Sequence, residues 1–250
     1  MLDPDGLVHL VESFADPAVG GVCGNKKYRA ARGADATEGG ENLYWRYDKL
    51  QKGRESAIGS IFAADGTLYA IRKSLYVPME DPAQADDIAI STRVVLQGRR
   101  LLFEPLAVAW EEAPVEGCLE FRRKIRVTNH SVRALLNLGA ALFRSGFYSV
   151  ELLSHKLLRH LVPFFLIPLF LSNVALAFGH GLFRMLLGFH LLFYASALLG
   201  ATLRRSPLGR SRLFAIPYYF TLVNAAAFLG VLSILRGERV KAWTPRSGLR

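Results

Sequence analysis

Cysteine is scarce in this sequence. Its two cysteines, Cys23 and Cys118, stand in dissimilar surroundings and lack the spacing of a metal-binding pair. They cannot supply the disulfide framework of a small secreted domain or a four-cysteine zinc site. A cleavable signal peptide is also missing, because Leu2–Asp5 is polar from the outset. The sequence therefore predicts reduced thiols in a cytoplasmic domain.

Acidic residues are almost absent after Leu157. Only Glu238 is acidic in this part, which holds eleven lysines and arginines, whereas Met1–Leu157 has equal numbers of basic and acidic residues. The formal net charge of +10 therefore belongs to the apolar part of the chain. A nucleic-acid-binding protein is expected to carry its positive charge on a polar folded domain, so we expect no nucleic acid as a partner. Arginines beside apolar runs indicate contact with membrane lipids.

Three long runs without charge follow residue 160. They are Leu161–Phe178, Met185–Leu203 and Leu213–Leu235. At about 18 residues or more, each can cross the hydrocarbon core as a helix. We predict a membrane domain over 158–236, with helices at about 161–178, 183–203 and 213–235, and a basic tail over 237–250. Buried helices of a soluble protein are the alternative, but 250 residues are too few to enclose three of them.

The part before residue 117 mixes helical and strand patterns. Apolar residues recur at helical spacing over 7–14 and 42–58, and short apolar runs typical of strands cover 19–28, 101–105 and 107–110. A small, polar loop is predicted over 30–40. This order predicts an α/β domain over 1–116. Residues 117–157 alternate leucines and valines with arginines, which predicts amphipathic interfacial helices that join this domain to the membrane.

A glycine-containing turn is predicted within Gly59–Tyr76. Two short apolar strands are expected on either side of Asp65-Gly66-Thr67. Gly66 can adopt a positive φ, and a loop of small residues leaves room for a ligand to lie against the backbone. A plain hairpin turn is an equally good interpretation.

Two adjacent acids, Asp86 and Asp87, precede apolar residues that recur at helical spacing up to Gly98. The dipole at a helix N-terminus favours ionised carboxylates, and an ionised carboxylate can take a proton from an acceptor hydroxyl. Capping of the helix is the simpler interpretation of the pair taken alone.

The order of these motifs resembles the second half of the catalytic domain of family 2 glycosyltransferases, the membrane-integrated synthases related to those of hyaluronan, cellulose and poly-N-acetylglucosamine. Four landmarks carry the resemblance in order over residues 2–131. They are Leu2–Leu7, the segment Ala64–Arg72, Asp86-Asp87 followed by Arg93, and Glu111–Pro114 leading to Glu120–Val127. These are similar to the segment after the metal-binding Asp-x-Asp, the acceptor-side loop, the Glu-Asp pair with its arginine, and the Gln-x-x-Arg-Trp signature.

The resemblance implies a GT-A fold and inversion at the anomeric carbon. Asp87 would be the general base and Asp86 its support. Asp65 and Gly66 would lie on the acceptor side, and Arg93 would help to bind substrate. Arg123 and Arg126 fall within the signature, where a guanidinium can neutralise charge on the leaving diphosphate. For Arg126, a surface cation near lipid headgroups is the alternative.

Two departures from the family pattern limit what can be transferred. Arg123 and Val127 stand where the signature has Gln and Trp, so the aromatic acceptor platform of the processive polymerases is missing, and processive synthesis and single transfer both stay open. The nucleotide-binding half with its Asp-x-Asp is also not visible, and Asp3-Pro4-Asp5 fits helix capping better than a metal site. The complete enzyme would need Mg²⁺ or Mn²⁺, but we expect no metal site on this chain and no activity from it alone.

The sequence therefore predicts a membrane-bound inverting glycosyltransferase fragment. It would transfer a sugar from a nucleotide-sugar donor to a lipid-linked or cell-envelope polysaccharide acceptor. Two alternatives are a non-catalytic membrane anchor or scaffold for a separate catalytic chain, and a small transporter, which the lack of charge inside the apolar runs disfavours. The expected location is the inner or plasma membrane, in several passes, with the catalytic part cytoplasmic. The basic tail then conflicts with the positive-inside rule unless one apolar run is re-entrant, for which the run with Pro163 and Pro168 is the candidate.

Overall fold

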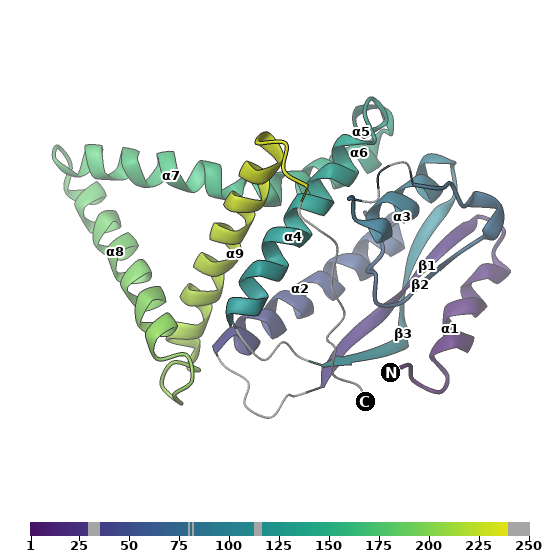
Figure 1. Ribbon diagram of the computed structural model, residues 1–250, viewed down its shortest axis with the longest axis horizontal. Coiled ribbons are helices and arrows are strands. Elements are labelled where there is room, and N and C mark those ends of the chain that lie inside the picture. Colours follow the sequence, from purple (N-terminus) through teal and green to yellow (C-terminus); the bar gives the residue numbers. More distant parts are fainter. Residues whose placement is uncertain (30–35, 80, 82, 113–116, 240–250) are drawn as a thin grey trace.

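The computed structural model describes residues 1–29, 36–79, 81, 83–112 and 117–239. In this part, helices dominate and three strands form one mixed sheet (Figure 1). The helices are α1 (Gly6–Glu12), α2 (Ala36–Ile58), α3 (Asp86–Leu96), α4 (Gly117–Leu136), α5 (Ala141–Arg144), α6 (Phe147–Glu151), α7 (Leu158–Ala177), α8 (Gly181–Thr202) and α9 (Arg212–Leu235). The strands are β1 (Val19–Arg29), β2 (Tyr69–Ile71) and β3 (Arg100–Glu112), and a π-helix (Leu152–Leu157) connects α6 to α7.

The sheet has the order β2-β1-β3, with β1 antiparallel to β2 and parallel to β3. Side chains alternate between its two faces, as a strand period of two requires. Val22 and Leu102 pack in one cluster with Leu10 of α1, whereas Cys23 and Leu101 pack in another on the opposite face. The sheet therefore lies between α1 on one side and the loop before β2 with α3 on the other.

The predicted strands 101–105 and 107–110 form the single strand β3. The register of β3 against β1 shifts around Pro105. Cys23 lies opposite Phe103 before the shift, and Asn25 lies opposite Val108 after it. Proline has no N–H for the ladder, so the strand passes it as an irregularity. The side-chain amide of Asn25 donates a hydrogen bond of 2.8 Å to the carbonyl of Pro105 there.

Two local predictions are wrong. Only Tyr69–Ile71 of the two strands expected within Gly59–Tyr76 forms. The apolar residues Ile61–Ala64 are buried without being a strand, because side chains replace a ladder: the amide of Phe62 donates to Glu55 at 3.3 Å, and that of Ala64 donates to the Ser91 hydroxyl at 3.0 Å. α2 begins at Ala36, inside the predicted loop 30–40, because alanine and glutamate there favour a helix.

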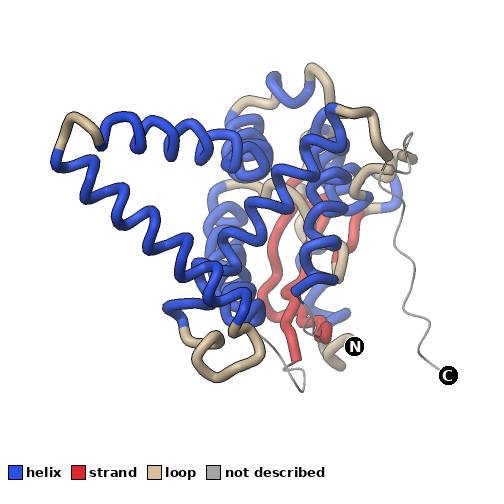
Figure 2. Tube along the Cα trace, turned by 60° about the vertical axis from the view of Figure 1, so that its left-hand side comes forward, coloured by secondary structure: helices blue, strands red, loops and turns tan. Residues whose placement is uncertain are grey.

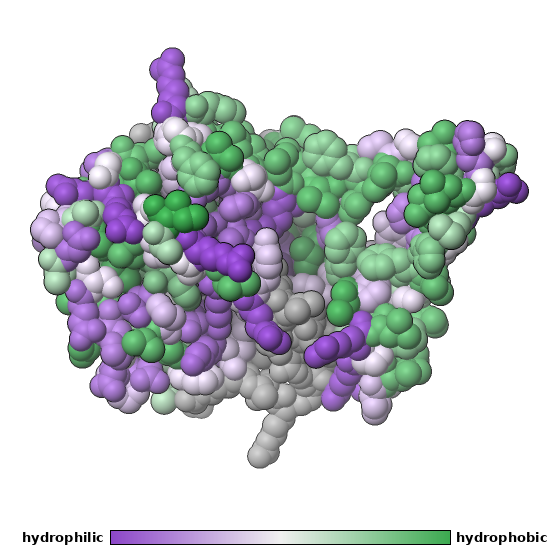
Figure 3. Space-filling model, turned by 180° about the vertical axis from the view of Figure 1, so that it is seen from behind, coloured by the Kyte–Doolittle hydropathy of each residue, from purple (hydrophilic) through white to green (hydrophobic). Residues whose placement is uncertain are grey.

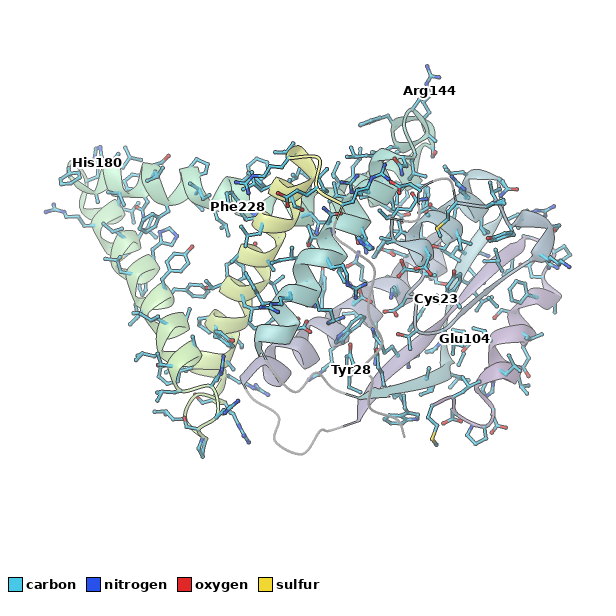
Figure 4. The ribbon with its side chains drawn as sticks, in the orientation of Figure 1. Cys23, Tyr28, Glu104, Arg144, His180 and Phe228 are labelled. Carbon is cyan, nitrogen blue, oxygen red and sulfur yellow. The ribbon has the colours of Figure 1, made fainter. Side chains whose placement is uncertain are left out.

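Within the described residues, three helices are long and apolar enough to cross a membrane, which is compatible with the predicted membrane protein. The apolar stretches are Phe147–Ala177, which includes α7, Gly181–Thr202 and Arg212–Leu235. In Figures 1 and 2, α7 and α8 run out from α9 and back, and we call these three helices the arm. His180 lies at the turn between α7 and α8, far from the sheet (Figure 4). Figure 3 shows hydrophobic surface gathered over this arm and hydrophilic surface over the sheet.

The arm is joined to the rest of the chain through α4 and α2, which both pack against α9. The contact is close because Gly230 lacks a side chain: a Cβ built there would lie 2.7 Å from Cβ of Thr128. The side-chain amide of Asn129 also donates to the Ser233 hydroxyl at 2.7 Å. Within the arm, the ring centroids of Phe228 in α9 and Phe164 in α7 lie 5.0 Å apart. Phe228 is labelled in Figure 4. These contacts place the three long apolar helices beside the sheet.

Candidate active site

A polar cavity of about 270 Å³ lies between α2, the loop before β2, the start of α3, α4 and the π-helix. Five of the seven predicted site residues line it: Asp65, Asp86, Asp87, Arg123 and Arg126. Charged residues that the sequence did not single out line it as well, namely Lys26, Asp48, Lys52, Lys124 and Lys156. The fold therefore gathers carboxylates and cations from six segments around one hollow, since Lys26 comes from β1.

Asp87 is held at the first turn of α3. Its Oδ2 accepts a hydrogen bond of 3.0 Å from the backbone N–H of Gly66, and its Oδ1 accepts one of 2.8 Å from the N–H of Ile88. Burial raises the pKa of this carboxyl above its ordinary value, although the positive charge of Lys156 opposes the rise. A carboxylate oxygen with one hydrogen bond still has a lone pair free to accept a proton from a ligand hydroxyl. Asp86 is exposed at the rim of the cavity.

Gly66 contacts Asp87 directly, but it does not have the positive φ that the sequence suggested. The absence of a side chain matters for proximity instead, because a Cβ at Gly66 would lie 3.3 Å from Oδ2 of Asp87. The glycine therefore lets the loop approach the carboxylate closely enough to hydrogen-bond it.

Asp65 belongs to a buried charge network beside Asp87. Its carboxylate lies 3.4 Å from the ammonium of Lys26 and accepts a hydrogen bond of 3.0 Å from the N–H of Thr67. Burial alone would raise its pKa, but Lys26, Lys52 and Thr67 hold the pKa of Asp65 well below its usual range. Deeper in the network, Lys52 pairs with Asp48 at 2.8 Å. Asp65 is therefore an ionised structural anchor of the loop.

Cys23 lies under the same loop. Its Sγ accepts a hydrogen bond of 3.2 Å from the N–H of Asp65, and the side chain, labelled in Figure 4, is completely buried. Burial raises the pKa of this thiol to about 11, so it is neutral at physiological pH. It is a free thiol, as the sequence predicts for this position, while the side chain of Cys118 lies outside the described residues.

Cations of α4 line the cavity together with the acids. Arg123 makes two hydrogen bonds of 2.7 Å to the buried carboxylate of Glu120, and Lys124 lies 3.2 Å from the same group. Burial and the nearby charge of Arg123 lower the pKa of Arg126. Crowding of like charges in a partly buried wall makes the wall attractive to an anion.

Arg93 is not brought to this cavity. Its guanidinium donates to the backbone carbonyls of Pro78 at 2.7 Å and Val77 at 3.3 Å. The side chain thus ties the segment before α3 to the helix itself. Part of the fourth landmark of the resemblance, residues 113–116 with Pro114, lies outside the described residues, as do residues 240–250 of the basic tail.

Lys156 is the residue that sequence reasoning missed most clearly. It falls within residues 117–157, which we predict to lie along the membrane interface, but the π-helix turns Lys156 into the cavity wall. Its ammonium stands 5.2 Å from the ring centroid of Phe62. The only sequence signal was a lysine placed close before a long apolar run. π-helical turns inside helices are frequent at functional sites.

The carboxylates of the cavity do not fit a divalent cation. Asp65 and Asp48 are neutralised by lysines, and both oxygens of Asp87 accept backbone N–H groups. Within the described residues, no group of three or more His, Cys, Asp or Glu side chains is placed to hold a metal ion. No chemical step is therefore assigned to a metal here.

Comparison with protein-family models and with curated proteins found no match.

Proposed function

We propose that the cavity is the acceptor side of an inverting glycosyl transfer, with Asp87 as the general base. The observation that carries the proposal is the placement of Asp87: a partly buried carboxylate at a helix start, facing a cavity with cations on its walls. The resemblance to family 2 glycosyltransferases supplies the reaction type, and the cavity supplies a place where it can occur.

In this reaction the acceptor hydroxyl passes its proton to Asp87 while its oxygen bonds to the anomeric carbon of the donor. The bond from that carbon to the nucleotide diphosphate breaks, and its electron pair leaves with the diphosphate. A general base works best when its pKa lies near the working pH, so the upward shift in the pKa of Asp87 suits this role. Asp86, at the rim, would orient the acceptor.

The cations of α4 would stabilise the leaving group. Arg126 and Arg123 line the same cavity as Asp87, and guanidinium groups bind phosphate oxygens through paired hydrogen bonds. Arg123 is already held by Glu120, so its position is set before any ligand arrives. Preorganised charge of this kind lowers the barrier without a reorganisation cost.

The experiment introduces Asp87→Asn at the chromosomal copy and measures sugar transfer in native membranes, with a panel of radiolabelled nucleotide sugars. Transfer should fall by about 10²–10⁴-fold, the usual contribution of a general base. Glu104→Gln, a half-buried acid of β3 that does not line the cavity, is the matched control and should leave transfer unchanged. Unchanged turnover in Asp87→Asn would exclude the carboxylate as the base.

A non-catalytic membrane anchor is the second candidate, favoured by the close α4–α9 contact at Gly230. An anchor needs a rigid joint between its polar and apolar parts, but it needs no ionised carboxylate. The anchor function predicts that Asp87→Asn leaves the activity of associated enzymes intact. It also predicts that Gly230→Val reduces this activity, because the joint between α4 and α9 is disturbed.

A further inference from the structure

An apolar groove of about 610 Å³ lies beside the polar cavity, between α2, α4, α9 and the start of α7. Its walls include Val127 and Thr128 of α4 and Ile216, Val223 and Ala227 of α9. The volume is that of a typical pocket for a small ligand. Because α9 is one of the helices long and apolar enough to cross a membrane, the groove is continuous with the expected lipid phase.

The groove and the polar cavity meet. Lys124, Val127 and Lys156 line both of them. A molecule can therefore place one end beside Asp87 and the other along α9. A water-soluble acceptor would leave the apolar half of this hollow unused.

The residues at the junction are cationic. Lys124, Lys156 and Arg159 line the groove, and none of its described lining residues is acidic. Lys156 makes no hydrogen bond or ion pair with another described residue, and its contact is the ring of Phe62 at 5.2 Å. The Nε2 atom of His160 is also buried without a hydrogen-bond partner among the described residues. A cation such as Lys156 in a largely apolar wall is costly to bury alone, so an anionic group beside it would be favoured.

We propose that this groove binds the hydrocarbon chain of a bilayer lipid with a phosphate headgroup. The phosphate lies against Lys156 and Arg159, and the group that accepts the sugar extends from it toward Asp87. The inference rests on the proposed function and deepens it, because it assigns the acceptor to a class: a membrane-resident amphiphile with an anionic headgroup. Charge complementarity selects the headgroup, and the apolar wall of α9 selects the chain.

The test is photo-crosslinking of the full chain in phosphatidylcholine vesicles. The probe is dodecyl phosphate with a diazirine at the chain end, and the labelled peptides are mapped by mass spectrometry. Labelling should concentrate on α9 around Val223, which lines the groove away from the polar cavity. Lys156→Met should reduce it about tenfold or more, because hydrogen bonds to charged groups contribute about 1.5–3 kcal/mol.

A second pair of variants keeps the test independent of Lys156. Val223→Trp fills the groove and should abolish labelling, whereas Leu229→Trp, on an exposed position of α9 outside the groove, should not. Size-exclusion profiles of all variants establish that they fold.

Three results would overturn the proposal. If a dodecanol probe with the same diazirine labels as strongly as the dodecyl phosphate probe, the groove recognises the hydrocarbon chain and not the phosphate. Competition by inorganic phosphate would mean a site for free phosphate. Unchanged labelling in both Lys156→Met and Val223→Trp would place the probe elsewhere. Asp87→Asn should label normally, so a failure of sugar transfer and a failure of lipid binding are separate observations.

Discussion

Glu120 is a buried carboxylate whose removal should weaken the cavity wall. The substitution Glu120→Gln keeps the shape of the side chain and removes its charge. It removes the negative charge to which Arg123 donates two hydrogen bonds of 2.7 Å and from which Lys124 lies 3.2 Å away. Glu120 itself is 1% exposed, so water cannot replace the lost interaction on its side.

The expected loss of folding free energy is about 2–3 kcal/mol. Breaking a fully buried ion pair costs about 3–5 kcal/mol, but the side chain of Arg123 is 34% exposed, so water can solvate part of its charge. For a chain of this size, each kcal/mol corresponds to about 2–4 °C in melting temperature, so Tm should fall by about 4–12 °C. The assay is thermal unfolding of the purified protein in detergent.

The pH dependence gives a sharper check. Burial would raise the pKa of Glu120, but Arg123 and Lys124 together lower it below the ordinary value of 4.5. The stabilisation is therefore complete above that ordinary value and is lost as pH falls through the lower pKa of the folded state. The difference in Tm between wild type and Glu120→Gln should be largest at neutral pH and should shrink in acid.

The control is Glu111→Gln, the same change in an exposed ion pair. Glu111 lies 3.3 Å from Lys26 and is 50% exposed, so its loss should cost less than about 1 kcal/mol. Equal shifts in Tm for the two variants, or a Glu120→Gln difference that does not change with pH, would refute this account of the α4 network.

Three further outcomes are expected. The acid limb of the pH–rate profile of transfer should lie above pH 3.8, the ordinary value for an aspartate, because burial raises the pKa of Asp87 and only its ionised form accepts the proton; a limb below that value would contradict the assignment. Gly230→Val should destabilise the chain by about 1–3 kcal/mol in a detergent melt, because its Cβ would meet Cβ of Thr128 at 2.7 Å; a Tm equal to wild type would mean that α4 and α9 can move apart. Cys23 should resist maleimide labelling in the folded chain and react after denaturation, because it is buried and its pKa is raised to about 11; rapid labelling of the folded chain at Cys23 would exclude this packing.

Local patterns predicted the long elements well. The apolar runs near 161–178, 183–203 and 213–235 became α7, α8 and α9, and the acid pair did open a helix, α3. These features depend on hydropathy and on helical spacing within one segment, which are present in the sequence without reference to the rest of the chain. The α/β prediction was correct only in coarse form, because β2 has three residues and much of the predicted strand material around Ile61 is a loop.

The sequence alone determined that an acid pair opens a helix, that positive charge accompanies the apolar part, and where long apolar helices occur, because each follows from residues close together in the chain. Only the tertiary structure decided which charges share the cavity: it brought Lys156 and Lys52 to Asp87 and Asp65, and it left Arg93 bound to the carbonyls of Pro78 and Val77. The reason is physical. Which side chains meet across the interior depends on how helices and loops pack against one another, and no spacing along the chain encodes that distance.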